Sequence, residues 1–277
     1  MTQELPATRS LKPASASVRT FEVVEARTVS PSFRRVTLGS LGDGFEQEFD
    51  YLGHDHWFRL FFAAADRELV LPFGGADGWY SRLLAMPDET RPIVRNYTIR
   101  DARRDGERWL LDVDFVLHAG QSGDVEGEAA RWCLRARPGD RVGLLDQGRI
   151  HRGAEHDGPL VIVADETGLP GVEGIARSLA AEAGDGSGAR RAVRCIVEIG
   201  DADDRRELPG FDVEWALRDG HAAVGSAALE TLRSAAVDPG SAAYIVGEGS
   251  ATLAARAHLL ESGVPKDRID FCAYWRR

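Results

Sequence analysis

The first half of the chain carries short runs in which apolar and polar residues alternate, with turn residues between them. Alternation with a period of two places every second side chain on one face of an extended strand. The spacing predicts an antiparallel barrel or sandwich, with a short helix over 129–137. The runs that support this prediction cover residues 21–24, 33–38, 57–62, 95–100, 109–116 and 141–145.

The pattern changes near residue 153. A polar stretch rich in Gly and Pro, residues 153–159, leads into the apolar run Leu160-Val161-Ile162-Val163-Ala164, which is typical of a strand buried on both faces of a parallel sheet. Strand and helix patterns then alternate, which predicts a doubly wound parallel sheet. The expected strands cover 160–164, 192–199, 213–217, 242–246 and 269–273, and the expected helices cover 170–183, 226–236 and 251–262.

These patterns divide the chain into three expected segments: a flexible arm over 1–20, a β-domain over 21–155 and an α/β domain over 156–277. The arm has no apolar block of signal-peptide length, so we expect a cytoplasmic protein. A length of 277 residues suits two domains, because single hydrophobic cores stop growing well before this size.

Composition narrows the class of protein. Hydrophobic residues make up 43% and charged residues 28% of the chain, and no apolar run is long enough to cross a membrane. The formal net charge of −10 lacks the positive field that nucleic acids and acidic membranes attract. We therefore expect a soluble monomer that binds neither.

Cysteine and histidine positions give no sign of a metal site. Cys133, Cys195 and Cys272 are far apart in sequence and are expected to be core thiols. The tripeptide His54-Asp55-His56 would point its imidazoles to opposite faces if it were part of a strand, so a structural role is expected for it.

The run Arg95-Asn96-Tyr97-Thr98 offers the first candidate chemistry. A flavin needs a guanidinium for its diphosphate, an aromatic face for its ring and a small donor at its redox nitrogen. Arg95, Tyr97 and Thr98 can supply these three groups. The same run also fits an ordinary barrel strand with a surface Arg and a packed Tyr.

Several separated motifs, taken together, resemble the siderophore-interacting protein family, whose members are FAD-containing ferric-siderophore reductases. The resemblance implies an antiparallel FAD-binding β-barrel followed by a doubly wound NAD(P)H-binding domain, as in ferredoxin reductases. The motifs that carry it are Arg95-Asn96-Tyr97-Thr98, residues 114–118, residues 164–170, Val246-Gly247-Glu248 and Ala273-Tyr274-Trp275-Arg276.

The resemblance also implies roles for individual residues at FAD. Arg95 would neutralise the phosphates, Tyr97 would lie along the flavin ring and Thr98 would donate to it. Where the family has Gly-Pro-Ala-Ser, this chain has Gly127-Glu128-Ala129-Ala130, without the hydroxyl and with an added carboxylate, so FAD is expected to bind more weakly. The remaining residues that the resemblance assigns to FAD are Asn96, Asp114, Val116, Leu117, His118, Gly127, Ala129, Ala130, Arg131 and Trp132. The stretch 120–124 before them is longer than the usual connection.

For the pyridine nucleotide the resemblance points to Asp165, Glu166, Thr167, Gly247, Glu248, Tyr274 and Trp275. The first three follow a strand and open a helix, where a dinucleotide's diphosphate sits in doubly wound folds. Their two carboxylates indicate either loose nucleotide contact or a helix cap. Tyr274 and Trp275 follow the last expected strand and would either cover the flavin or pack as an aromatic end-cap. Acids and arginines mixed over 201–206 leave NADH and NADPH both open as donors.

The implied substrate is a ferric siderophore, whose negative charge calls for a local positive patch with candidates Arg59, Lys266, Arg276 and Arg277. The expected function is electron transfer from NAD(P)H through FAD to the ferric siderophore. Iron is then released, because hard oxygen ligands hold Fe(II) less firmly than Fe(III). Two alternatives stay open: a flavoprotein that uses ferredoxin or another acceptor, and a non-catalytic carrier of ferric chelates.

Overall fold

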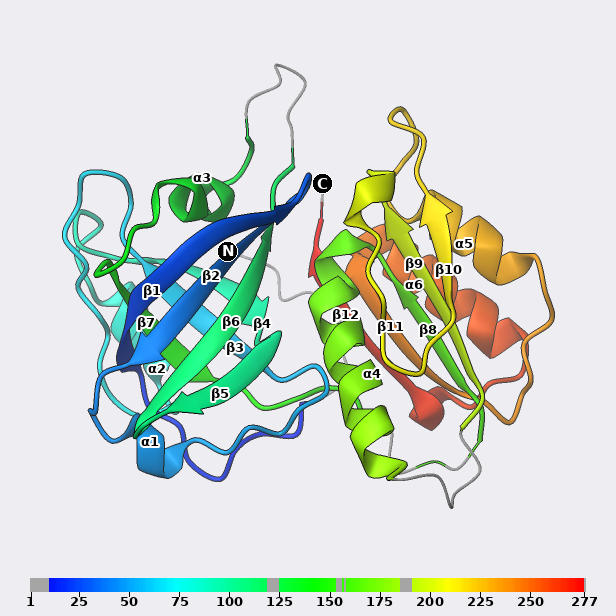
Figure 1. Ribbon diagram of the computed structural model, residues 1–277, viewed down its shortest axis with the longest axis horizontal. Helices are drawn as coiled ribbons and strands as arrows, with labels where there is room; N and C mark the ends of the chain where they lie inside the picture. The colour runs from blue at the N-terminus through cyan, green and yellow to red at the C-terminus, as the bar shows by residue number, and fades with distance from the viewer. Residues whose placement is uncertain (1–9, 119–124, 153–155, 157, 185–190, 277) are drawn as a thin grey trace. The chain divides into compact units, whose positions relative to one another are not determined.

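The computed structural model describes residues 10–118, 125–152, 156, 158–184 and 191–276 (Figure 1). The chain divides into two compact units, which we call the barrel unit and the α/β unit. The barrel unit contains Leu11–Leu52 and His56–Gly148, and the α/β unit contains Gly53–Asp55 and the described residues from Arg149 onward. By this division, Arg149 begins the α/β unit, and residues 11–20 belong to the barrel unit. Residues 1–9 of the expected arm lie outside the described residues.

The barrel unit is an antiparallel sheet with the strand order β4-β3-β7-β1-β2-β6-β5. Its edge strands β4 and β5 follow one another in sequence. Between them, the Ile99 N–H donates to the carbonyl of His56 beside β3 (2.7 Å), and the Arg100 N–H donates to the carbonyl of Asp112 in β6 (2.9 Å). The two edges therefore meet, and the predicted barrel closes. The strands are β1 (Arg19–Ser30), β2 (Phe33–Ser40), β3 (Trp57–Phe62), β4 (Ile93–Thr98), β5 (Asp101–Asp105), β6 (Arg108–Val116) and β7 (Arg141–Asp146).

Alternate residues of these strands fill the barrel. Phe21, Phe58, Leu60 and Phe115 are fully buried in one apolar cluster, so the period-two pattern in the sequence is the pattern of inward-facing side chains. Helix α3 (Glu128–Arg135) lies on this cluster through the Trp132 ring, whose centroid is 5.5 Å from those of Phe62 and Phe115. The two other short helices are α1 (Phe45–Glu48) and α2 (Trp79–Leu84).

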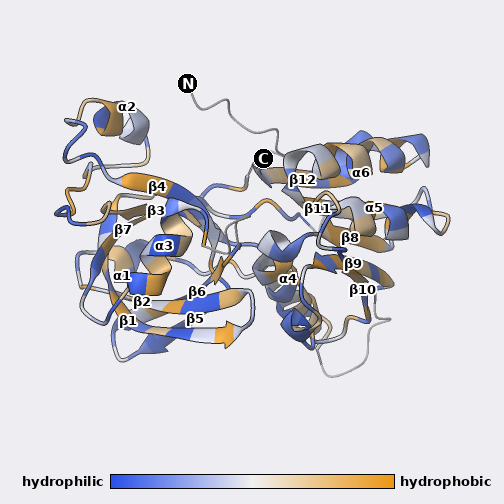
Figure 2. Ribbon diagram, turned by 90° about the horizontal axis from the view of Figure 1, so that it is seen from above, coloured by the Kyte–Doolittle hydropathy of each residue, from blue (hydrophilic) through white to orange (hydrophobic). Residues whose placement is uncertain are grey.

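The α/β unit holds a parallel sheet with the order β10-β9-β8-β11-β12, as the alternating pattern predicts. Helices α5 and α6 lie on one face of the sheet and α4 on the other (Figure 2). The strands are β8 (Leu160–Ala164), β9 (Val193–Ile199), β10 (Val213–Leu217), β11 (Ala242–Glu248) and β12 (Ile269–Trp275). The helices are α4 (Leu169–Glu182), α5 (Ser226–Arg233) and α6 (Gly249–Glu261), with single turns η2 (Glu166–Gly168), η3 (Ala202–Asp204) and η4 (Lys266–Arg268).

The chain order of the strands reverses beside β8. From β8 the chain proceeds outward to β9 and β10, and then returns to β11 on the other side of β8. In open α/β sheets, ligands bind outside the carboxyl ends of the strands at such a switch point. The ends of β8 and β11 are therefore the place to look for a nucleotide site.

The segment Gly53–Asp55 packs into the α/β unit on a face of α4 made of small residues. A Cβ atom at Gly174 would lie 1.9 Å from the His54 carbonyl oxygen, so only glycine fits there. The Asp55 carboxylate accepts hydrogen bonds from the His151 N–H (2.9 Å) and the Tyr244 hydroxyl (3.0 Å). The tripeptide 54–56 precedes β3 and is not part of a strand, so the strand argument about it is wrong. Its members nevertheless have structural partners, since the His56 ring lies 2.7 Å from Asp146.

No helix in the described part of the chain is both long and apolar enough to cross a membrane.

Candidate functional site

The edge strand β4 presents Arg95 and Tyr97 on one face and Asn96 and Thr98 on the other, as its alternation predicts. Arg95 is exposed, and its guanidinium donates to the Val94 carbonyl (2.8 Å). The Tyr97 ring packs against Phe115 with centroids 4.3 Å apart, and burial raises the pKa of its phenol, so it is neutral at physiological pH. Thr98 is buried, only 7% exposed.

The start of helix α3 lies within electrostatic reach of Arg95. The pKa of Glu128 in the first turn is lowered mainly by its hydrogen bond from Arg131 (2.6 Å), with smaller contributions from Arg135 and Arg95. The Glu128 carboxylate at this helix end is therefore paired with Arg131, and the positive charges of Arg135 and Arg95 add a weaker attraction.

The same end of α3 offers backbone donors. The first-turn N–H groups of a helix have no partners within the helix, and Gly127 before the helix provides no side-chain cap. Unpaired amides beside guanidinium groups are the donors that a diphosphate uses. The residues of β4 and α3 thus fit the phosphate and ring ends of FAD.

Several residues that the resemblance assigns to FAD have other partners. The buried Asp114 carboxylate accepts two hydrogen bonds from Arg35 across the β2–β6 pair (2.7 and 3.0 Å). The Trp132 ring is part of the barrel core. The Trp132 ring thus faces the barrel core, whereas Asp114 lies on the face of β6 opposite to the core residues Val113 and Phe115. Each side chain has a partner that the linear sequence does not reveal.

The other expected FAD residues lie around β6 and α3. Val116 ends β6, the Leu117 N–H donates to Ser32 (2.8 Å) and the His118 carbonyl accepts from Glu126 (3.0 Å). Ala129 and Ala130 are both 7% exposed, in the first turn of α3. The stretch 120–124 lies outside the described residues.

Replacing Glu128 by glutamine should tighten FAD binding about two- to five-fold, the range expected when one solvent-screened charge is removed. The substitution frees Arg131 and Arg95 from a competing carboxylate and removes its repulsion of phosphate. The measurement is the FAD dissociation constant, with Glu107→Gln on the exposed β5–β6 turn as a charge-matched control. Equal FAD affinities in the two variants would show that Glu128 does not act at the phosphate site.

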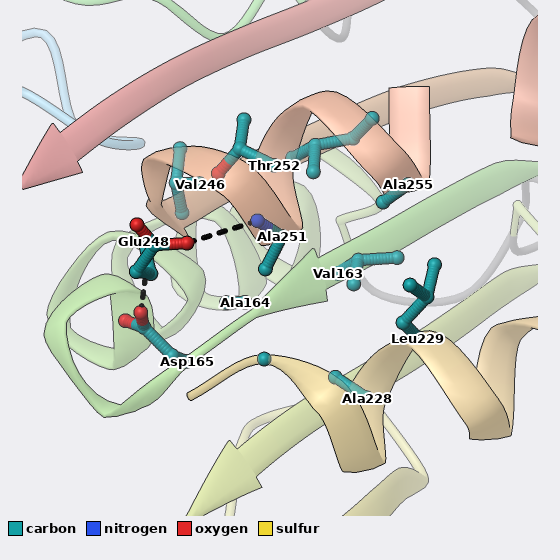
Figure 3. A pocket seen from close by; sticks show the side chains of 12 residues that line it. Val163, Ala164, Asp165, Ala228, Leu229, Val246, Glu248, Ala251, Thr252 and Ala255 are labelled. Carbon is teal, nitrogen blue, oxygen red and sulfur yellow. Dashed lines mark hydrogen bonds between the residues drawn. The ribbon is translucent and has the colours of Figure 1, made fainter. Parts of the chain in front are cut away.

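In the α/β unit, Asp165 follows β8 and is hydrogen-bonded to Glu248 of β11 and Trp275 of β12. Figure 3 shows the bond to Glu248. One carboxylate oxygen accepts from the Thr167 N–H (2.9 Å) and hydroxyl, and the other accepts from the Glu248 N–H (2.7 Å) and the Trp275 indole (3.3 Å). Asp165 is thus a cap of η2, which favours the capping alternative. Four residues expected at the nucleotide are hydrogen-bonded to one another.

Trp275 and Tyr274 belong to β12, so the prediction that they follow the last strand is wrong. The pairing of β12 with β11 continues past Ala273 through a register shift, so that Trp275 pairs with Glu248. The Tyr274 hydroxyl lies 3.1 Å from that of Tyr244 within the α/β unit.

The starts of α5 and α6 are both capped by the chain's own carboxylates. Glu248 accepts from the N–H groups of Ser250 (2.6 Å) and Ala251 (3.0 Å) in α6. Glu198, fully buried, accepts from three N–H groups at the start of α5. Both helix ends border the small pocket at the switch point that Figure 3 shows, lined by Val163, Asp165, Gly225, Val246, Glu248 and Thr252. Anion positions at these two helix starts are therefore already filled.

Arg218 joins the second acid of the loop to this network. Its guanidinium donates to both oxygens of Glu166 (2.7 and 3.0 Å) and to Glu198 (2.7 Å). Neither Arg218 nor Glu198 was predicted from the sequence to belong to this site. Both residues could have been found from the sequence, because they lie at the carboxyl ends of the expected strands over 213–217 and 192–199. The carboxyl ends of parallel strands share one edge of the sheet.

Asp165 should make stability depend on pH. Burial raises its pKa to about 7, and the Glu166 charge adds to the rise, whereas an unfolded aspartate titrates near 3.9. The folded state thus binds the proton more tightly, and this group's contribution to stability decreases as the pH rises from about 4 to about 7. In urea unfolding, the wild type should lose about 2 kcal/mol more than Asp165→Asn between about pH 5 and about pH 8. Equal losses would contradict the assignment.

Two of the predicted substrate cations, Lys266 and Arg276, are far apart within the α/β unit. Lys266 and Arg276 flank β12 at its opposite ends, which are roughly 20 Å apart for a strand of this length. Arg59 lies on β3 in the barrel unit, and Arg277 lies outside the described residues. These residues were grouped as candidates only because they are cationic, and the charge of a residue does not determine its distance from other residues in the fold.

Comparisons with known proteins agree with this arrangement. Residues 22–150 match the siderophore-interacting FAD-binding domain, and residues 159–277 match the siderophore-interacting protein domain. The chain is 27% identical to the NADPH-dependent ferric-chelate reductase of Escherichia coli K12, over 93% of this chain and 92% of that protein.

Solved structures of similar proteins include a siderophore-related protein and a ferredoxin reductase. A siderophore utilization protein from T. fusca matches with a TM-score of 0.69 and 27% identity, over 96% of this chain and 95% of that one. The ferredoxin reductase of carbazole 1,9a-dioxygenase shares the fold, with a TM-score of 0.62 and 17% identity over 94% of this chain and 70% of that one. The chain belongs to the siderophore-interacting protein family, and its barrel is that family's FAD-binding domain.

Proposed function

We propose that this protein is a ferric-siderophore reductase that uses NADPH or NADH as its electron donor. The observation that carries the proposal is the placement of exposed Arg95 and the Tyr97 ring on one face of β4, in a unit that matches a FAD-binding domain. The E. coli relative, named an NADPH-dependent ferric-chelate reductase, supports the same activity. Bound FAD would supply the chemistry, since it accepts a hydride and can release electrons singly.

The chain's own residues then have binding and positioning roles. Arg95 and the first-turn amides of α3 hold the diphosphate. The neutral phenol of Tyr97 offers its face to the flavin ring, and the Thr98 hydroxyl donates to that ring. No side-chain acid or base takes part. Iron leaves after reduction because the oxygen ligands of a siderophore hold Fe(II) less firmly than Fe(III).

The electron donor is held weakly at the switch point. Glu198 and Glu248 already occupy the helix-start amides that would otherwise bind phosphate, so a dinucleotide has to use other donors. The same carboxylates favour reduced ferredoxin as a second candidate donor, because a protein donor needs no phosphate site. NADPH, NADH and ferredoxin are therefore compared in one assay.

We further propose that the protein acts as a monomer in the cytoplasm. Its cysteines are free thiols, which suits a reducing compartment. Iron released there is directly available to the cell's own iron proteins.

The test uses FAD-loaded protein under anaerobic conditions, with a ferric siderophore and a chromogenic chelator of Fe(II). We expect the yellow flavin band to bleach with at least one of the three donors, and the ferrous colour to develop in proportion to donor consumed. A protein that takes up no FAD but binds the ferric siderophore would be a carrier. A flavin that no donor bleaches would also overturn the proposal.

A further inference from the structure

We propose that the segment Gly53–Asp55 is a proton-sensitive latch, which binds to the α/β unit while His54 and His151 are neutral and is released when they take up protons. We call this segment the latch. The residues that border it in sequence, Leu52 and His56, both belong to the barrel unit. The place of the latch in the α/β unit therefore depends on its own contacts.

The backbone of the latch lies on the small-residue face of α4 in a strained conformation. A Cβ atom at Gly174 would lie 1.9 Å from the His54 carbonyl oxygen, and the His54 N–H donates to the Ser178 hydroxyl (2.8 Å). His54 has a φ of 50°, in the left-handed region that is unfavourable for a residue with a Cβ atom. The contacts of the latch have to offset this cost, so weakening them favours release.

The rings of His54 and His151 form a buried side-chain contact of the latch. Their Nδ1 atoms are 3.2 Å apart, the His54 side chain is 3% exposed and His151 is 1% exposed. In a hydrogen bond between two imidazole nitrogen atoms, one atom carries the proton and the other accepts it. If both rings were protonated, two N–H groups would point at each other and the contact would become repulsive.

The outer nitrogen atoms determine which ring donates. His54 Nε2 lies 3.1 Å from the Glu182 carboxylate on α4, which can only accept, so His54 carries its proton on Nε2 and accepts at Nδ1. His151 therefore donates from Nδ1 and keeps a lone pair on Nε2. Among the described residues, this buried Nε2 has no hydrogen-bond partner.

A proton on either ring leads to the same unfavourable group. Added to His151, it makes Nε2 a buried donor without an acceptor, which costs free energy. Added to His54 at Nδ1, it reverses the hydrogen bond between the rings, and the His151 proton has to move to Nε2. The bound latch thus has no satisfied arrangement for a protonated pair.

The cationic groups around the pair also oppose a positive charge on it. Burial lowers the pKa of His54 to about 4, and the charge of Arg149 adds to the shift. Burial also lowers the pKa of His151, with smaller contributions from His54, Arg191 and Arg149. Both rings are therefore neutral at physiological pH while the latch is bound.

Two carboxylates near the pair act in the opposite direction. The Glu182 side chain is 49% exposed, so solvent screens its attraction for an imidazolium. Asp55, in the latch itself, accepts from the N–H groups of Ile150 (3.2 Å) and His151 (2.9 Å) and from the Tyr244 hydroxyl (3.0 Å). Burial raises the pKa of Asp55, so its contribution to latch binding increases as the pH falls.

Strands β11 and β12 complete the surroundings of the pair. The Tyr244 ring crosses that of His151 edge-on, with centroids 5.5 Å apart, and burial raises the pKa of its phenol. Burial raises the pKa of the Cys272 thiol to about 12. Asp270 accepts from the Arg152 N–H (2.8 Å). The phenol and the thiol are thus neutral, and the Asp270 carboxylate is bonded to the backbone.

The two histidines make latch binding weaker in acid. In the released latch, His54 is in water and binds a proton with the ordinary pKa of about 6.5, far above its value of about 4 in the bound latch. The released state thus binds more protons, so the bound latch is favoured above about pH 6.5 and is lost as the pH falls toward about 4. For His54 alone, the ratio of bound to released latch should fall about 20-fold from about pH 7 to about pH 5.

The test is amide hydrogen exchange, measured by mass spectrometry on the full-length, FAD-loaded protein at about pH 7 and about pH 5. Protection factors correct for the pH dependence of intrinsic exchange and are compared for peptides that contain the latch. Over this interval, latch protection should fall about 20-fold more in the wild type than in His54→Asn, which has no titrating ring at this position. Asparagine tolerates the left-handed region, and Asp55 is present in both proteins, so its opposite effect cancels.

Controls address folding and location. His221→Gln removes an exposed histidine of the same unit and should behave like the wild type. Protection of β8 and β11 reports on the whole α/β unit and should change equally in the wild type and in His54→Asn. If His54→Asn does not fold by circular dichroism, His54→Gln takes its place with the same expected result.

Equal changes of latch protection in the wild type and the His54 variant would overturn the proposal. A loss of protection at β8 and β11 as large as that of the latch would also overturn it, because the whole unit would then be unfolding. The assay contains no electron donor and no ferric siderophore, so its outcome is independent of the proposed reductase activity.

Discussion

Replacing Arg218 by alanine is expected to lower the free energy of unfolding by about 3–5 kcal/mol. The guanidinium is the shared partner of Glu166 and Glu198, whose side chains are 4% and 0% exposed. Without it, two carboxylates stay buried at the carboxyl edge of the sheet and lose the guanidinium that they share. The loss reflects the stranded charges rather than the strength of the ion pair itself.

Chemical denaturation of the variant measures this loss. Arg27→Ala serves as the control, because Arg27 and its partner Glu25 are about half exposed, and breaking such a pair costs about 1 kcal/mol or less. Adding Glu166→Gln to Arg218→Ala should recover part of the stability, since one stranded charge is removed. A loss in Arg218→Ala no larger than in the control would contradict the account of the buried network.

Replacing Arg95 by alanine is expected to raise the dissociation constant of FAD about 10- to 100-fold, the effect of losing hydrogen bonds from a charged donor. Stability should change little, because the side chain is exposed. The measurement is the quenching of flavin fluorescence on titration.

Arg95→Lys should recover only part of the affinity, since a lysine keeps the charge but lacks the planar fork that fits phosphate. The Arg27→Ala variant again controls for removal of a surface arginine. Unchanged FAD affinity in Arg95→Ala would contradict the proposal that Arg95 binds the phosphates.

The fold was predictable where periodicity is strong. The strand over 57–62 has the predicted bounds, because buried Phe58 and Leu60 alternate with half-exposed Trp57 and Arg59. The parallel strand over 213–217 is also placed as predicted. Strand ends were less predictable: β12 runs on to Trp275 because the indole finds a partner in Asp165, far away in sequence.

The candidate site was predictable only in part, for a related reason. Local alternation correctly places Arg95 and Tyr97 on one face of β4. It gives no sign that Asp114 is paired with Arg35, or that Arg218 bridges two acids from other strands, because charges interact through space and the partners are separated by long stretches of chain.

The most direct test of the central claim is a single turnover without any pyridine nucleotide. FAD-loaded protein is reduced photochemically under anaerobic conditions and mixed with excess ferric siderophore. We expect the yellow flavin band to return while two ferric ions are reduced per flavin, because the reduced cofactor holds two electrons and each Fe(III) accepts one. A flavin that stays reduced in the presence of excess ferric siderophore would contradict it.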